Sequence, residues 1–218
     1  MQRLATTSAV EALEAELERR ILDGDLRPGE RLREVELAAR YGVGRHTLRA
    51  AFDGLVRRGL LTRMRNRGVS VPVLTRTELA DIYELRTALE TEAFRTLAGK
   101  GEVPAAAREA LARLSRLRGN APWRLVVAAD FDFHSAVVEA AGNRRLKRVH
   151  DELQAEILLC LAQLGAGYAS PRELAEEHRE LLAKLEARKP AAAERAIRSH
   201  FERALSWLQA EGKRTPPA

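Results

Sequence analysis

Residues 34–58, EVELAARYGVGRHTLRAAFDGLVRR, decide the fold class of the N-terminal part of the chain. Residues 34–40 predict a short helix, the YGVG at 41–44 predicts a tight turn, and residues 45–58 predict a second helix. Apolar residues repeat along one face of the second helix, which is typical of a buried face. Two short helices joined by a tight turn form a helix-turn-helix, whose second helix fits the major groove of DNA.

The segments on either side extend this motif into a small domain. Apolar residues at 10, 13, 17 and 21 predict a helix over residues 10–22. Residues 60–64 (LLTRM) and 68–73 (GVSVPV) predict two strands joined through residues 65–67, which is the pattern of a wing. We therefore expect a winged helix-turn-helix domain over residues 1–73.

The positive charge of the chain is concentrated in this domain. The whole chain has a net charge of +6 and a pI near 10.0, which favours an acidic partner. Residues 40–70 contain eight arginines and one acid, Asp53, so this segment alone carries a charge of +7. A solvated arginine-rich surface is the simple interpretation of such an excess. Its concentration in one segment favours nucleic acid as the partner.

This segment resembles the DNA-binding domain of the GntR family of bacterial transcription regulators. The sequence departs from the family pattern at Gly44 and Ala50, where relatives usually carry Ser and Glu. The resemblance rests on the order and spacing of Pro28-Gly29-Glu30, Leu32, Glu36-Leu37-Ala38, Gly42-Val43, Arg45, Arg49, Gly59-Leu60 and Gly68-Val69.

The candidate DNA contacts lie on the second helix and the wing. Arg45 and Arg49 are one helical turn apart, so both can enter a major groove and contact guanine. His46 and Thr47, beside them on the helix, can reach base edges or phosphates. Arg33, at the start of the helix predicted over residues 34–40, can reach a phosphate. The wing residues either approach the DNA backbone or form a solvated hairpin tip. The predicted set is Arg33, Arg45, His46, Thr47, Arg49, Arg65, Arg67 and Gly68.

The rest of the chain predicts a second domain made only of helices. Aromatic residues are 5% of the chain while Ala, Leu, Glu and Arg recur, so the predicted fold class is mainly α. Thr77 is expected to cap the first helix and Asn143 the fourth. Residues 74–76 are interpreted as a linker, 77–211 as the helical domain and 212–218 as a tail. The six predicted helices span about 77–98, 104–118, 122–141, 144–164, 171–188 and 190–211.

Residues 130–134, DFDFH, place an acid and a histidine on the inner face of the third of these helices. Asp130 and His134 share the apolar face, whereas Asp132 points to solvent. His178 and His200 also lie in the middle of apolar faces on later helices. One such histidine is usually a satisfied core residue. Three of them with a buried aspartate favour a site for Zn²⁺, Ni²⁺ or Mn²⁺, which take neutral imidazole and carboxylate as ligands.

This second segment resembles the FCD effector-binding domain of the FadR branch of the GntR family, and its six predicted helices resemble the VanR subgroup. The resemblance implies that Asp130, His134, His178 and His200 bind a divalent metal ion, and that the effector is a small carboxylate. His150 matches no metal position and is interpreted as structural. The matching stretches are YELRTALETEA, DFDFHSAVVEAAGN, EEHRELLAKLEA and AIRSHF.

Arg86 lies in the centre of an apolar helix face, where a guanidinium group needs a partner. Glu90, one turn further along the helix, is the simple partner. The alternative is that Arg86 holds an anionic effector, because its planar fork fits a carboxylate.

These features predict a homodimeric regulator that binds double-stranded operator DNA and responds to a small carboxylate. The single cysteine, Cys160, excludes an intramolecular disulfide, and the sequence has neither a leader-like start nor an apolar run of membrane length. We therefore expect a cytoplasmic protein without a membrane partner. Two alternatives remain, a sensor whose signal is the metal ion and a metal-dependent hydrolase. The hydrolase leaves the arginine-rich segment unexplained, so we do not expect an enzyme.

Overall fold

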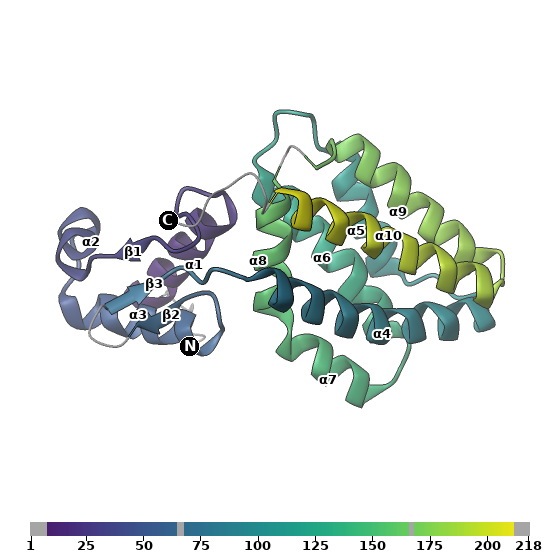
Figure 1. Ribbon diagram of the computed structural model, residues 1–218, viewed down its shortest axis with the longest axis horizontal. Helices are drawn as coiled ribbons and strands as arrows, with labels where there is room; N and C mark the ends of the chain where they lie inside the picture. Colours follow the sequence, from purple (N-terminus) through teal and green to yellow (C-terminus); the bar gives the residue numbers. More distant parts are fainter. Residues whose placement is uncertain (1–7, 65–67, 166–167, 212–218) are drawn as a thin grey trace, which may run out of the picture. The chain divides into compact units, whose positions relative to one another are not determined.

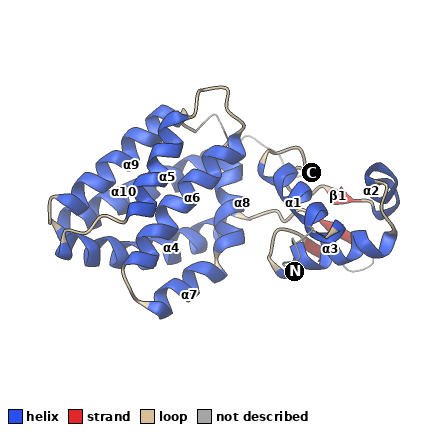
Figure 2. Ribbon diagram, turned by 180° about the vertical axis from the view of Figure 1, so that it is seen from behind, coloured by secondary structure: helices blue, strands red, loops and turns tan. Residues whose placement is uncertain are grey.

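The structure, a computed structural model, describes residues 8–64, 68–165 and 168–211 of the chain (Figure 1). The chain divides into two compact units, residues 1–74 and 75–218. Among the described residues, strands occur only in the first unit (Figure 2). The predicted fold class, mainly α with an N-terminal winged helix-turn-helix, is confirmed. No helix among the described residues combines the length and the apolar character needed to cross a membrane.

The first unit is built around a helix-turn-helix whose inner face is buried. Helix α2 ends at Gly42, whose left-handed φ of 62° lets the chain turn sharply toward α3. Helix α3 buries Leu48 and Leu55 completely, and α1 packs against it. Strand β3 lies between β1 and β2, and both pairs are antiparallel. The elements are α1 (Ala9–Leu22), β1 (Arg31–Leu32), α2 (Glu34–Tyr41), α3 (Arg45–Arg57), β2 (Thr62–Met64) and β3 (Gly68–Ser70).

The wing differs in detail from the sequence prediction. The predicted strands over 60–64 and 68–73 are shorter, because Leu60 and Leu61 turn inward after α3 and are buried before β2 begins. Strand β1 is not predicted by the sequence. It forms because Leu32 aligns with Val69 of β3 and both side chains are buried. The wing residues Arg65 and Arg67 lie outside the described part of the chain.

The second unit is a helical bundle with α6 at its centre. Helix α6 packs against α4, α5, α7 and α8, and α10 runs along α4 (Figure 1). Its sequence WRLVVAADFDFHSAVVEA is apolar on most sides, which explains this central position. The described helices are α4 (Arg76–Lys100), α5 (Ala105–Arg116), α6 (Trp123–Ala140), α7 (Arg144–Glu152), α8 (Gln154–Leu164), α9 (Pro171–Glu186) and α10 (Pro190–Glu211).

Two predicted boundaries in this unit are wrong. Thr75, not Thr77, caps α4, because Thr75 and Glu78 form a capping box, so the predicted linker 74–76 is largely part of the helix start. The single helix predicted over 144–164 is two helices that meet at Leu153. The polar α7 buries only Leu146 and His150, whereas α8 is buried on most sides, so the two segments follow different paths. The described bundle therefore has seven helices instead of six.

Candidate metal centre and DNA-reading helix

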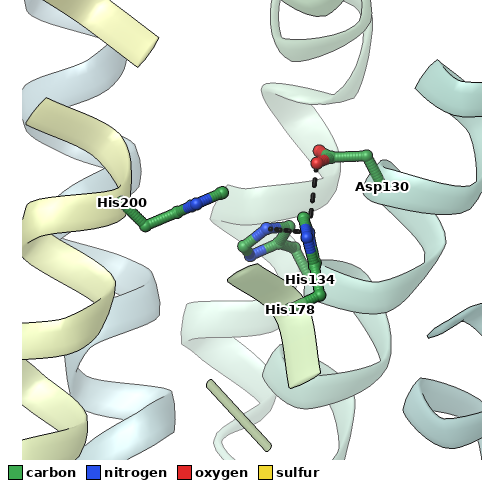
Figure 3. A group of neighbouring side chains, drawn as sticks. All are labelled: Asp130, His134, His178 and His200. Atoms are coloured by element: carbon green, nitrogen blue, oxygen red, sulfur yellow. Dashed lines mark hydrogen bonds and ion pairs between the residues drawn. The ribbon is translucent and has the colours of Figure 1, made fainter. Parts of the chain in front are cut away.

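Four side chains from three helices converge in the core of the second unit (Figure 3). Helix α6 supplies Asp130 and His134 from adjacent turns, α9 supplies His178 and α10 supplies His200. One ligand atom from each residue lies within 4.8 Å of the others, and all four residues are buried. The structure therefore brings together the whole set of metal ligands that the sequence predicts.

Each histidine of this cluster uses its Nδ1 atom to contact an acceptor. His134 Nδ1 lies 2.6 Å from Glu90 Oε2, His178 Nδ1 lies 2.7 Å from the Leu174 carbonyl oxygen, and His200 Nδ1 lies 3.0 Å from Glu177 Oε2. A carbonyl or carboxylate oxygen accepts a hydrogen bond, so we place the proton of each neutral ring on Nδ1. This tautomer leaves a lone pair on each Nε2, as in histidines that bind metals.

The remaining acceptor atoms face one another at short distances. Nε2 of His178 lies 3.2 Å from Nε2 of His134 and 3.1 Å from Oδ1 of Asp130. In the tautomers assigned above, none of these three atoms carries a proton. A proton added to His178 Nε2 could be donated to His134 Nε2 or to Asp130 Oδ1, but not to both. A cation placed between the three atoms would interact favourably with the lone pairs of all three. Three imidazoles and a carboxylate are also a donor set suited to a divalent transition metal.

The protonation states suit metal binding at neutral pH. Burial lowers the pKa of His134 to about 4, even though Glu90 acts in the opposite direction. Burial also lowers the pKa of His200. For Asp130, burial acts to raise the pKa, whereas the nearby charge of Arg86 acts to lower it. His134 and His200 are therefore neutral at pH 7, the form in which an imidazole binds a metal ion.

Arg86 lies beside this cluster with only part of its guanidinium group paired. Its Nε donates to Glu90 Oε1 at 2.7 Å, so the simple partner predicted from the sequence is present. Its Nη2 lies 3.7 Å from Asp130 Oδ2, and neither of these two buried atoms has a hydrogen-bond partner. The guanidinium carbon lies 4.4 Å from the centre of the Phe201 ring. The free side of Arg86 thus faces the acid of the metal cluster.

Two carboxylates that the sequence pattern does not assign to the cluster support its histidines. Glu90 is completely buried and contacts His134, although the sequence identified it only as a partner of Arg86. Glu177 immediately precedes His178 but contacts His200 on another helix. His150, interpreted as structural, is buried, stacks on Phe131 and lies 3.4 Å from Glu90 Oε1. Only the packing of the helices reveals these contacts.

In the first unit, the predicted DNA contacts lie on the exposed side of α3. Arg45, His46 and Arg49 are exposed, and Thr47 is half-buried. Arg49 Nε donates to Glu34 Oε2 at 2.7 Å, an exposed ion pair that costs little to exchange for a phosphate or base contact. Helix α3 begins after Gly44, which offers no side-chain cap, so the helix N-terminus can receive a phosphate group.

The two other described candidates for DNA contacts are Arg33, which precedes α2, and Gly68, which lies in the wing. Arg33 is exposed at the start of α2, and its Nη1 donates to Glu36 at 2.8 Å. Gly68 begins β3 with a φ of 83°, a conformation that favours glycine. Exposed arginines and an open helix start give this face the character of an anion-binding surface.

Two protein families match the chain, one on each side of the boundary between its two units. Residues 9–71 match the family described as bacterial regulatory proteins, gntR family, and residues 81–203 match the FCD domain. The chain is 30% identical over 200 residues to a probable D-xylose utilization operon transcriptional repressor of Paenarthrobacter nicotinovorans, covering 91% of this chain and 88% of that protein. It is 27% identical over 201 residues to the HTH-type transcriptional repressor GlaR of Escherichia coli, covering 87% and 90%.

A solved structure shows the same architecture. The crystal structure of a putative transcriptional regulator GntR from Rhodococcus sp. RHA1 superposes with a TM-score of 0.77 at 25% sequence identity. The match covers 94% of this chain and 99% of that structure. The similarity therefore extends over both units.

Proposed function

Because the chain belongs to the GntR family of bacterial regulatory proteins and carries an FCD domain, we propose that this transcriptional regulator binds operator DNA as a homodimer whose DNA affinity responds to a small carboxylate. The carboxylate binds at a divalent metal ion held by Asp130, His134, His178 and His200. The observation that carries the proposal is the convergence of four buried side chains with metal-binding atoms beside the half-paired Arg86.

DNA reading is assigned to α3. Arg45 and Arg49 are exposed one turn apart at its N-terminal end, where a recognition helix contacts base edges. A homodimer presents this helix twice, so its operator is an inverted repeat with two half-sites. Arg33, His46, Thr47 and the wing add contacts to phosphates and base edges.

The metal site supplies one anchor for the effector and Arg86 supplies the other. A bound Zn²⁺, Ni²⁺ or Mn²⁺ ion acts as a Lewis acid toward the effector carboxylate. Arg86 lies on α4, whereas the four ligands lie on α6, α9 and α10, so an effector held at both places joins helices that are separate in the sequence. Effector binding then changes the affinity for DNA, and DNA binding changes the affinity for the effector by the same factor.

The DNA-binding part is tested with Arg49→Ala and an operator selected from a pool of genomic fragments. Loss of one bidentate contact costs roughly 1–3 kcal/mol, and a dimer makes that contact twice, so we expect at least a tenfold loss of affinity. Arg95→Ala is the matched control, because Arg95 is also exposed and paired with a glutamate, Glu92, on α4. Equal operator affinity of the Arg49→Ala variant and the wild type contradicts the assignment of α3.

The effector part is tested by following operator release while the metal and the acid are varied separately. The purified protein is treated with chelator, reloaded with Zn²⁺, and then titrated with a panel of short-chain carboxylates. We expect release only with metal and acid together, and we expect Arg86→Ala to weaken acid binding while leaving metal content unchanged. Release by the metal alone would instead favour a metal-sensing regulator.

A further inference from the structure

A small cavity lies directly beside the metal cluster, at the free side of Arg86. With the side chains in their present positions its volume is about 20 Å³, which is room for one or two water molecules, so a larger occupant enters only when the surrounding side chains move apart. Most of its lining is apolar. The exceptions are five polar side chains, namely Tyr83, Arg86, Asp130, Tyr168 and His200.

Four of these five side chains carry a buried polar atom without a hydrogen-bond partner in the protein. The atoms are Tyr83 Oη, Arg86 Nη2, Asp130 Oδ2 and Tyr168 Oη. A buried polar group without a partner costs about 1–3 kcal/mol, and such groups are rare in native proteins. Their concentration around one cavity indicates that its occupant is polar, whether that occupant is water or a ligand.

The two tyrosine rings are fixed by their aromatic neighbours. Tyr83 lies on α4, three residues before Arg86, and therefore on the same side of the helix. Its ring meets the edge of Phe201 with 6.0 Å between centres, and Tyr168 meets Trp207 at the same separation. Burial raises the pKa of Tyr83 and raises that of Tyr168 to about 12, so both hydroxyls stay neutral at pH 7. Each can both donate and accept a hydrogen bond.

We propose that Tyr83 and Tyr168 determine the specificity of the effector site, and that their hydroxyls bind a hydroxyl group of the effector. The inference rests on the proposed function, because it assumes that the effector carboxylate occupies the metal and Arg86. The effector is then a short carboxylic acid with hydroxyl groups on its carbon chain. A plain aliphatic or aromatic acid leaves the phenol hydroxyls buried without partners, and a site built in this way rejects such analogues strongly.

The test compares acids that differ by one hydroxyl group. Lactate and glycerate form one pair, and malate and tartrate form the other. In each pair both acids have a 2-hydroxyl group that can reach the metal, so only the second hydroxyl distinguishes them. Isothermal titration of the full-length, Zn²⁺-loaded protein should show at least tenfold tighter binding of the more hydroxylated acid in one pair. In the Tyr83→Phe, Tyr168→Phe double variant this ratio should fall to about one, because the second hydroxyl of the acid loses its partners.

The variants also report on the folded state. Because the Tyr83 hydroxyl has no hydrogen-bond partner in the protein, Tyr83→Phe should keep or raise the melting temperature of the acid-free protein. Tyr41→Phe is the matched control, since Tyr41 accepts a hydrogen bond from Arg20 at 3.2 Å in the other unit. We expect this control to lower the melting temperature slightly and to leave acid binding unchanged.

The outcomes separate the inference from the proposed function. If the two acids of each pair bind through Arg86 with the same affinity, the role of the tyrosines is wrong. The same holds if the preference for the more hydroxylated acid survives in the double variant. Both outcomes leave the proposed function intact. If the metal-loaded wild type binds none of the four acids, the tyrosine assignment and the hydroxy-acid class are wrong. If further carboxylates of other classes also fail to bind, the proposed carboxylate site is wrong as well.

Discussion

Glu90 is a buried carboxylate that contacts both Arg86 and His134. It accepts a hydrogen bond from Arg86 at 2.7 Å and lies 2.6 Å from His134 Nδ1, and it is completely buried. Burial acts to raise the pKa of Glu90, but Arg86 and His134 outweigh it and hold this pKa well below the usual range. One carboxylate therefore both balances the arginine and orients His134, a candidate metal ligand.

Glu90→Gln should weaken metal binding without changing the shape of the site. The amide oxygen of the glutamine can accept a hydrogen bond from Arg86 or from His134. Its NH₂ group then faces the other donor and cannot accept a hydrogen bond from it. Loss of a contact that orients a ligand usually lowers metal affinity roughly 10- to 100-fold. The measurement is Zn²⁺ competition with a chromophoric chelator. Glu92→Gln on the exposed side of the same helix is the control, and an equal affinity for both variants would contradict this role of Glu90.

At the residue scale, the sequence predicted which four residues cluster and missed the carboxylates beside them. Asp130, His134, His178 and His200 could be found because each is a polar residue at a helical position otherwise occupied by apolar side chains. Glu177 carried no such signal, because it lies next to His178 in a run of charged residues. Its contact with His200 depends on how α9 packs against α10, which periodicity within one helix does not report.

At the scale of elements, helix ends were predictable where a local signal marks them. Asn143 caps α7 as predicted, and its side chain accepts hydrogen bonds from the backbone of Arg145 and Leu146. The break at Leu153 carries neither glycine nor proline, and strand β1 has only two residues. Both arise from tertiary packing, so neither has a pattern in its own sequence.

The cap of α7 gives a prediction at this scale. Asn143→Ala should lower the free energy of unfolding by about 1 kcal/mol, because two backbone N–H groups lose their acceptor. The helix is only nine residues long and holds Leu146 and His150 in the core, so it has little other local support. The urea midpoint measures the loss. Asn120→Ala, at an exposed position outside any helix, should leave the midpoint unchanged, and an equal shift in both would contradict the capping role.

At the scale of the whole molecule, metal should stabilise one unit and leave the other unaffected. A ligand that binds only the folded state adds to the stability of the unit that holds it. We expect Zn²⁺ to slow hydrogen exchange in α6, α9 and α10, and chelator to reverse this, while α1 to α3 exchange at the same rate in both conditions. Mass spectrometry of peptides resolves the units. His178→Ala should abolish the response, and a uniform effect along the chain would contradict the separation into two units.

The position of α10 has a consequence for how the cell makes this protein. Helix α10 runs along α4, the first helix of its unit, and carries His200, the last of the four clustered side chains in the sequence. A ribosome releases residues 1–74 long before it reaches residue 200, and domains generally fold in the order of their synthesis. The unit that we propose reads DNA is thus complete while the unit that we propose binds the effector still lacks α10, the partner of α4. A chain terminated before α10 would keep its DNA-binding unit and be insensitive to the effector.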